Sequence, residues 1–337
     1  MPILPPAADL ERDDQLVELP WGRLWVAAAA VSLLALGAWE GYWRGRGVEP
    51  SLSDVDASWG VARDWVEPTS IVLLGTSKMQ SAIDPRLLGR ELEREPAIQL
   101  AVINASPLPV LEHLAVDSAF RGTVVMDVAP RIFFDAELRH ERRGRAILEA
   151  YRLYRSSPGE RLDARLTLLA ESSVVLRRAA FSLRRLLEIW TKSRPLAVPF
   201  DRVRFDRFRE LDFSRIDLAA RRLTQRTILA AGRPVAADGV VALAERTRRA
   251  AQAIEGRGGR VVLVFLPISG PARDTEERLF PREDYWQLLV ERSGLDAIHF
   301  LDHPELAGFE CPDGLHLETE QAARFTIAFA GGLGRLD

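Results

Sequence analysis

The sequence predicts an α/β protein: a three-layer α/β/α sandwich around a mostly parallel sheet, with an N-terminal transmembrane helix and a helical insertion. Three observations predict it: short apolar runs that alternate with helix-like segments, turn residues directly after those runs, and one uncharged segment near the start. The 337 residues are 47% hydrophobic and 28% charged, which suits a folded chain with a large core. The net charge of -3 argues against nucleic acid as a partner.

The first element is an apolar segment, residues 24–39, which carries no charge and is flanked by aromatic residues and arginines. It is slightly shorter than the ~18 to 20 residues of a full span, but its aromatic ends extend into the interfaces. We therefore expect residues 21–43 to form a single-span membrane anchor. A signal peptide is the main alternative, although the stretch before Arg23 is acidic and no small-residue cleavage site follows. A buried core helix is the other alternative, and the flanking arginines leave the orientation open.

Two short regions flank this helix. Residues 1–20 are acidic and rich in proline, which predicts a mobile tail. Residues 44–66 are expected to form a juxtamembrane connector. The globular domain is then expected to occupy residues 67–337.

Strand and helix patterns alternate through this domain. Candidate strands cover residues 70–75, 98–104, 123–128, 260–267 and 297–302, and candidate helices cover residues 85–94, 109–118, 240–255, 282–293 and 318–333. Near-continuous apolar runs are typical of strands that are buried on both faces of a parallel sheet. Their alternation with helices predicts right-handed crossovers and a flavodoxin-like sheet, with the functional cleft at the carboxyl ends of the strands.

Residues 131–238 interrupt the alternation and predict a helical insertion that covers or flanks the cleft. A long amphipathic helix is expected at residues 161–190, where leucines alternate with arginines. Its arginines are Arg161, Arg165, Arg177, Arg178, Arg184 and Arg185. They suit an anionic lipid or an acidic polymer, and a solvated charged face is the plainer interpretation.

Three residues carry the candidate chemistry. Ser77 follows the apolar run at residues 71–74, where a turn would expose its hydroxyl at the top of the sheet and place its N–H near a developing oxyanion. Asp313 and His316 lie three residues apart near the C-terminus, so the histidine can act as a base that the carboxylate orients. The alternative is structural, with Ser77 as a helix cap and Asp313 in a polar turn.

Other residues are weaker candidates. The histidines have no zinc-like spacing and Cys311 is the single cysteine, so we expect no metal and no organic cofactor. Trp286 is a candidate for a carbohydrate cleft, or else an aromatic residue packed at a helix start. Lys78 and Arg131 are the further candidates for substrate contact.

Four segments give the chain a family resemblance. They are LLGTSKMQSAIDP at residues 73–85, AVINASPLPVLEHL at residues 101–114, VVMDVAP at residues 124–130 and CPDGLHL at residues 311–317. In these segments the chain resembles the SGNH (GDSL-like) hydrolase superfamily, in particular the membrane-anchored, periplasm-facing SGNH-like proteins of bacteria.

The resemblance implies Ser77 as nucleophile, His316 as base and Asp313 as its partner, with Ser77, Asn104 and Ala105 at the oxyanion hole. It implies an esterase or O-acyltransferase that acts on an acyl ester, often of an envelope polysaccharide. It also implies the bacterial inner membrane, a domain in the periplasm, and a membrane-bound acyltransferase as a partner.

The sequence departs from the family pattern in the first three of these four segments. Thr76 replaces the usual aspartate, Asn104 and Ala105 stand where a glycine is usual, and Asp127 stands near the usual asparagine donor. An ionised Asp127 cannot donate, and one lost oxyanion donor typically costs ~10² to 10³ in rate. The alternative is therefore a catalytically inactive SGNH-like binding or scaffold protein of an envelope assembly. A cytoplasm-facing enzyme is a third hypothesis.

Overall fold

A computed structural model describes residues 20–53, 55–181, 191 and 198–335. The chain forms two compact units, Met1–Arg46 and Gly47–Asp337. The tail expected at residues 1–20 lies outside the described residues, apart from Pro20.

The N-terminal unit contains one helix, α1 (Trp21–Gly45), of 25 residues. At about 1.5 Å per residue its length exceeds the roughly 30 Å hydrocarbon core of a bilayer. Its mean hydropathy reaches 1.5 over an 18-residue window, none of which is buried, so α1 is long and apolar enough to cross a membrane. Near its C-terminal end Trp39, Tyr42 and Trp43 form an aromatic cluster, and the Arg46 guanidinium lies 4.5 Å from the Tyr42 ring centroid.

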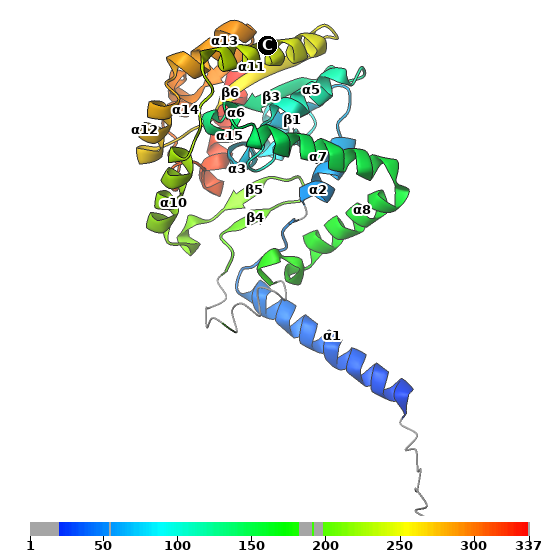
Figure 1. The fold of residues 1–337 in the computed structure, drawn as a ribbon. Coiled ribbons are helices and arrows are strands. Elements are labelled where there is room, and N and C mark those ends of the chain that lie inside the picture. The colour runs from blue at the N-terminus through cyan, green and yellow to red at the C-terminus, as the bar shows by residue number, and fades with distance from the viewer. Residues whose placement is uncertain (1–19, 54, 182–190, 192–197, 336–337) are drawn as a thin grey trace, which may run out of the picture. The chain divides into compact units, whose positions relative to one another are not determined.

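The second unit contains a parallel sheet of five strands in the order β2-β1-β3-β6-β7 (Figure 1). The strands are β1 (Ile71–Leu74), β2 (Ile98–Gln99), β3 (Thr123–Asp127), β6 (Arg260–Phe265) and β7 (Asp296–His299). In register, Leu73 pairs with Gln99 on one side and with Val125 on the other. The expected parallel sheet is confirmed, although β2 and β7 are shorter than the apolar runs that contain them.

Two groups of helices pack around the sheet. Helices α5 (Leu108–Val116), α11 (Ala237–Glu255) and α13 (Leu288–Ser293) contact one another through α11, and helices α3 (Ser77–Ala82) and α4 (Pro85–Glu91) both contact α15 (Thr319–Gly334). The five expected helices are present. Helices α4, α5 and α15 begin within one residue of the expected starts, α11 begins three residues early, and α13 begins at Leu288 after a π-helical turn at residues 283–287. Helices α3 and α12 (Gly270–Leu279) are further elements that follow the strand ends directly.

The expected connector at residues 44–66 is wrong for most of its length. Residues from Gly47 onward belong to the globular unit, and residues 55–64 form α2 (Val55–Asp64), which packs against two helices of the insertion. Trp59 of α2 is 1% exposed, and its indole N–H donates to the backbone carbonyl of Leu100 at 2.9 Å. The amphipathic pattern of residues 55–64 is short and ends in charged residues, so the sequence alone favours a linker there.

The insertion at residues 131–238 is only partly helical. It contains α6 (Pro130–Phe133), α7 (Arg139–Ser156), α8 (Pro158–Ser173) and α10 (Leu218–Ala230), and also an antiparallel hairpin of β4 (Asp201–Val203) and β5 (Arg209–Leu211). Of the long helix expected at residues 161–190, the upstream part is confirmed by α8, but the helix ends at Ser173, where Val174 turns to an extended conformation. Residues 182–190 lie outside the described part of the chain.

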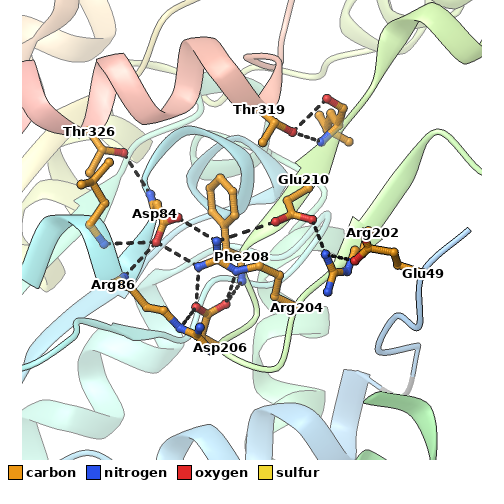
Figure 2. Close-up of polar contacts among 12 residues, drawn as sticks. Glu49, Asp84, Arg86, Arg202, Arg204, Asp206, Phe208, Glu210, Thr319 and Thr326 are labelled. Atoms are coloured by element: carbon orange, nitrogen blue, oxygen red, sulfur yellow. Dashed lines mark hydrogen bonds and ion pairs between the residues drawn. The ribbon is translucent and has the colours of Figure 1, made fainter. Parts of the chain in front are cut away.

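An ion-pair network fastens the β4–β5 hairpin to the core (Figure 2). The Arg204 guanidinium donates to both carboxylate oxygens of Asp84, the N-cap of α4, at 2.8 and 3.0 Å. Burial opposes ionisation of Asp84, but its contacts with Arg204 outweigh that effect and lower the pKa of its carboxyl. At the other end, Thr319 of α15 exchanges two hydrogen bonds with the backbone of Leu211, at 2.8 and 3.0 Å. The hairpin is therefore held by two different helices.

Candidate functional site

The turn between β1 and α3 positions Ser77. Gly75 has φ +151, and a Cβ there would lie 2.7 Å from Cβ of Asp127, so only glycine fits. Thr76 caps α3 by accepting from the Lys78 N–H at 3.2 Å. Ser77 is the first residue of α3, and its half-buried side chain lies at the carboxyl edge of the sheet.

The structure brings Ser77, His316 and Asp313 together across most of the domain's sequence. Ser77 Oγ lies 2.9 Å from His316 Nε2, and His316 Nδ1 lies 2.8 Å from Asp313 Oδ2. Asp313 Oδ1 accepts from the backbone N–H groups of Leu315 and His316, at 3.0 and 2.8 Å. Both partners of the serine are buried, with Asp313 1% and His316 6% exposed.

The hydrogen-bond chemistry assigns the protons in this chain of contacts. Burial disfavours the charged form of Asp313, but the hydrogen bond from the His316 ring and those from the backbone N–H groups of Leu315 and His316 outweigh it and hold the pKa of its carboxyl well below its usual range. The ionised carboxylate only accepts, so Nδ1 of His316 carries the proton that it donates to Asp313. Nε2 of a neutral ring is then an acceptor for the Ser77 hydroxyl, which is the arrangement that a general base requires.

Helix α10 supplies two further donors to Asp313. Arg221 Nε and Gln225 Nε2 donate to Asp313 Oδ2 at 3.2 and 3.1 Å. Gln225 is 5% exposed, so this contact is shielded from solvent. Neither residue was predicted from the sequence. Their spacing of four places them on one face of a helix, but no motif links that face to Asp313.

The backbone N–H groups expected at the oxyanion hole differ in their hydrogen bonding. The Ala105 N–H donates to the Val102 carbonyl at 3.1 Å and so is used in a turn. The N–H groups of Ser77 and Asn104 make no hydrogen bond to any residue that the structure describes. The Val102 N–H donates to the Gly75 carbonyl at 3.0 Å, which brings the loop before Asn104 alongside the turn before Ser77. Asn104 has φ +56 and is exposed, so the chain turns sharply there.

Asp127 lies behind the turn and is fully buried, with 0% exposure. Its Oδ2 accepts from the Thr76 hydroxyl at 3.2 Å, while its Oδ1 has no hydrogen-bond partner among the described residues. Burial raises the pKa of Asp127 to about 6, although Lys78 and Thr76 favour its charged form. Asp127 thus supports Thr76 from inside the core.

The three candidates for substrate contact occupy different surroundings. Lys78 is 5% exposed, and its ammonium donates to the Leu266 carbonyl at 3.1 Å. Trp286 is 4% exposed and packs edge-on against Phe265, with 5.5 Å between ring centroids. Arg131 is half-buried. Their role toward a substrate stays a prediction.

Arg131 belongs to a polar cluster at the Asn104 turn. Its guanidinium donates to Asn104 Oδ1 and lies against His140 Nε2, both at 3.2 Å. His140 Nδ1 lies 2.8 Å from the Asn104 carbonyl oxygen, which fixes the turn from a second side. Burial lowers the pKa of His140, so the neutral ring is favoured.

A cavity of about 500 Å³ borders the loop that carries Asp313. Leu223, Pro271 and Ala272 form apolar parts of its wall, and Arg222 and Arg226 lie at its α10 side. In the described part of the chain, no group of His, Cys, Asp or Glu side chains is arranged to hold a metal ion.

No protein-family model matches this chain, and no curated protein is similar to it. The resemblance to SGNH hydrolases therefore stays a prediction that rests on the four sequence segments and on the site geometry.

Proposed function

We propose that the protein is a membrane-anchored, SGNH-like esterase or O-acyltransferase that uses Ser77, His316 and Asp313. The observation that carries the proposal is the continuous chain of contacts from Ser77 Oγ through the His316 ring to Asp313, at 2.9 and 2.8 Å. The strand order and the two helix groups favour a three-layer, flavodoxin-like sandwich, which is the arrangement that the family resemblance implies.

In the proposed reaction, Ser77 Oγ attacks the carbonyl carbon of an acyl ester as its proton passes to His316 Nε2. Asp313 stabilises the resulting imidazolium, and the Ser77 and Asn104 N–H groups are the proposed donors to the oxyanion. Collapse breaks the ester bond, and the leaving alcohol takes the proton from His316. Water or a sugar hydroxyl then gives its proton to His316 and attacks the acyl-enzyme. As the acid or new ester leaves, His316 returns that proton to Ser77 Oγ.

The proposed setting is the bacterial inner membrane, with α1 as the single span and the α/β unit in the periplasm. The substrate class is an acyl ester of an envelope polysaccharide, and a membrane-bound acyltransferase is the proposed partner. A reporter enzyme that works only outside the cytoplasm should be active when it is fused to the C-terminus, which would support this orientation. Activity of a fused reporter that works only in the cytosol would reject it.

Hydrolysis of p-nitrophenyl acetate by the detergent-solubilised protein tests the chemistry. Ser77→Ala should lower the rate by about 10³-fold or more, because the attacking oxygen is removed. Ser81→Ala is the matched control in the same helix, since Ser81 is 1% exposed and hydrogen-bonds the Ser77 carbonyl rather than His316. Equal rates for the wild type and Ser77→Ala would contradict the proposal.

A binding or scaffold protein is the second candidate, favoured by the position of Asp127. This residue supports Thr76 from the core and has no exposed atom from which to donate to an oxyanion. Under this alternative neither wild type nor variant hydrolyses the ester, and both bind the polysaccharide equally.

A further inference from the structure

Two buried arginines line a cavity of about 250 Å³ on the α3 side of the unit. Arg178 follows α8 and is 7% exposed, and Arg207 lies in the β4–β5 turn and is 2% exposed. Gln80, one helical turn after Ser77 in α3, lines the same cavity. The cavity therefore adjoins the helix that carries the proposed nucleophile.

Neither arginine has a carboxylate partner among the described residues. Arg207 donates to the backbone carbonyls of Gln99 and Ala101, at 2.6 and 3.2 Å. Arg178 donates to the carbonyl of Glu49 at 2.8 Å and to that of Asp201. Carbonyl oxygens satisfy N–H groups but do not neutralise a positive charge. Arg207 is therefore buried without a counter-ion, and Arg178 has only the charges of Asp201 and Glu49 nearby.

A third arginine in the cavity wall provides the contrast. Arg209 donates to the carboxylate of Asp201 through two nitrogens, at 3.1 and 2.7 Å, and so is neutralised. Asp201 is thus already engaged and is not available in full to Arg178. Burial alone lowers the pKa of Arg207 to about 9, which reflects how strongly this position disfavours an uncompensated charge.

The cavity also presents an unused acceptor. Gln80 is 5% exposed, and its Nε2 donates to the Ala101 carbonyl at 2.9 Å. Its Oε1 has no hydrogen-bond partner among the residues described here. An oxygen of this kind would accept from a ligand hydroxyl, so the cavity combines positive charge with a hydroxyl-binding group.

The cavity is held in shape by the network that fastens the hairpin. Arg204, three residues before Arg207, forms an ion pair with Asp84 at the N-cap of α4, and the Leu211 N–H donates to the Thr319 hydroxyl of α15 (Figure 2). The turn that carries Arg207 is thereby fixed before any ligand arrives, which lowers the entropic cost of binding.

We propose that this cavity binds an acidic sugar residue, with Arg207 and Arg178 facing its carboxylate and Gln80 accepting from a hydroxyl. Guanidinium groups match the two oxygens of a carboxylate, and the volume lies below the ~300 to 1,000 Å³ of drug-sized pockets, which suits one sugar unit. The assignment of a polysaccharide rests on the proposed function, whereas the anion site itself does not. It would select polymers with carboxylates for the acyl-ester chemistry at Ser77.

Calorimetric titration of the full-length, detergent-solubilised Ser77→Ala variant tests the site without turnover. Sodium glucuronate should bind saturably, and glucose at the same concentrations should not. Arg207→Gln and Arg178→Gln should each weaken glucuronate binding by about tenfold or more, since each removes a charge-assisted contact. Arg248→Gln, an exposed position of α11 that lines neither this cavity nor the one beside Asp313, is the matched control and should leave the affinity unchanged.

Several results would overturn the inference. Absence of glucuronate binding would reject the anion site. Equal binding by the control and by folded Arg178→Gln would also reject it. Arg178→Gln provides the test if Arg207→Gln fails to fold. Inorganic phosphate that binds more tightly than glucuronate would reject the acidic sugar in favour of a phosphate group. Glucuronate binding that persists while the wild type lacks esterase activity would reject the triad and keep this site.

Discussion

Asp127 connects the interior of the sheet to the nucleophile turn through the Thr76 hydroxyl, at 3.2 Å. Burial raises its pKa from 3.8 to about 6. Between these two pH values the folded state holds a proton that the unfolded state has lost, so the free energy of unfolding falls as pH rises across this window.

Asp127→Asn should remove this contribution to the pH dependence. The free energy of unfolding of the wild type relative to the variant should fall by on the order of 2–3 kcal/mol between pH 4 and pH 7. Urea denaturation of both proteins in the same detergent, at half-unit pH steps, measures this difference. Parallel curves would show that the pKa of Asp127 is not raised in the folded protein.

Arg221 tests how far the insertion supports the triad. It donates to Asp313 Oδ2 at 3.2 Å from α10, so its loss leaves the carboxylate less firmly oriented. We expect Arg221→Ala to lower the rate of serine acylation about tenfold, as is typical for one hydrogen bond to a charged group.

Arg221→Lys should recover part of that rate because it keeps the positive charge. Arg248→Ala, an exposed position of α11 away from the Asp313 loop, should leave it unchanged. An Arg221→Ala rate equal to that of the wild type would remove Arg221 from the positioning role.

Ser77, Asp313 and His316 could be predicted together from the sequence, because the end of an apolar run and a short Asp–His spacing can both be recognised in it. Arg221 could not be found in that way. Its contact with Asp313 joins positions 92 residues apart, and depends on where the insertion folds back.

Among the elements, α2 differs most from its expected role, because it packs into the globular unit. Trp59→Ala should cost about 3–5 kcal/mol in the free energy of unfolding, since a large buried side chain leaves a cavity and loses its bond to Leu100. Trp65→Ala, just beyond α2, is the control, because Trp65 is 41% exposed and its loss should change stability little. Equal effects of the two changes, measured by urea denaturation, would indicate that residues 44–66 form a connector rather than part of the globular unit.

The elements of the main sheet were predictable because their apolar runs are long and continuous. The β4–β5 hairpin was not, since each strand has three residues and both are rich in charge. Its stability comes from partners distant in sequence, such as the Arg204–Asp84 pair, rather than from a local pattern.

For the whole molecule, the two compact units predict separable behaviour. A protein that begins at Gly47 should remain folded and stay in the aqueous phase after membrane fractionation, whereas the full chain should sediment with membranes. Circular dichroism and fractionation measure the two properties. A shortened protein that still sediments with membranes would show that α1 is not the sole anchor.

In the proposed mechanism Ser77 is a nucleophile that His316 and Asp313 activate. Labelling of the full-length protein with a fluorophosphonate probe tests it most directly, because the probe bonds covalently to an activated serine. We expect labelling of the wild type, strongly reduced labelling of His316→Ala and no labelling of Ser77→Ala. Equal labelling of the wild type and Ser77→Ala, or none in a folded wild type, would contradict it.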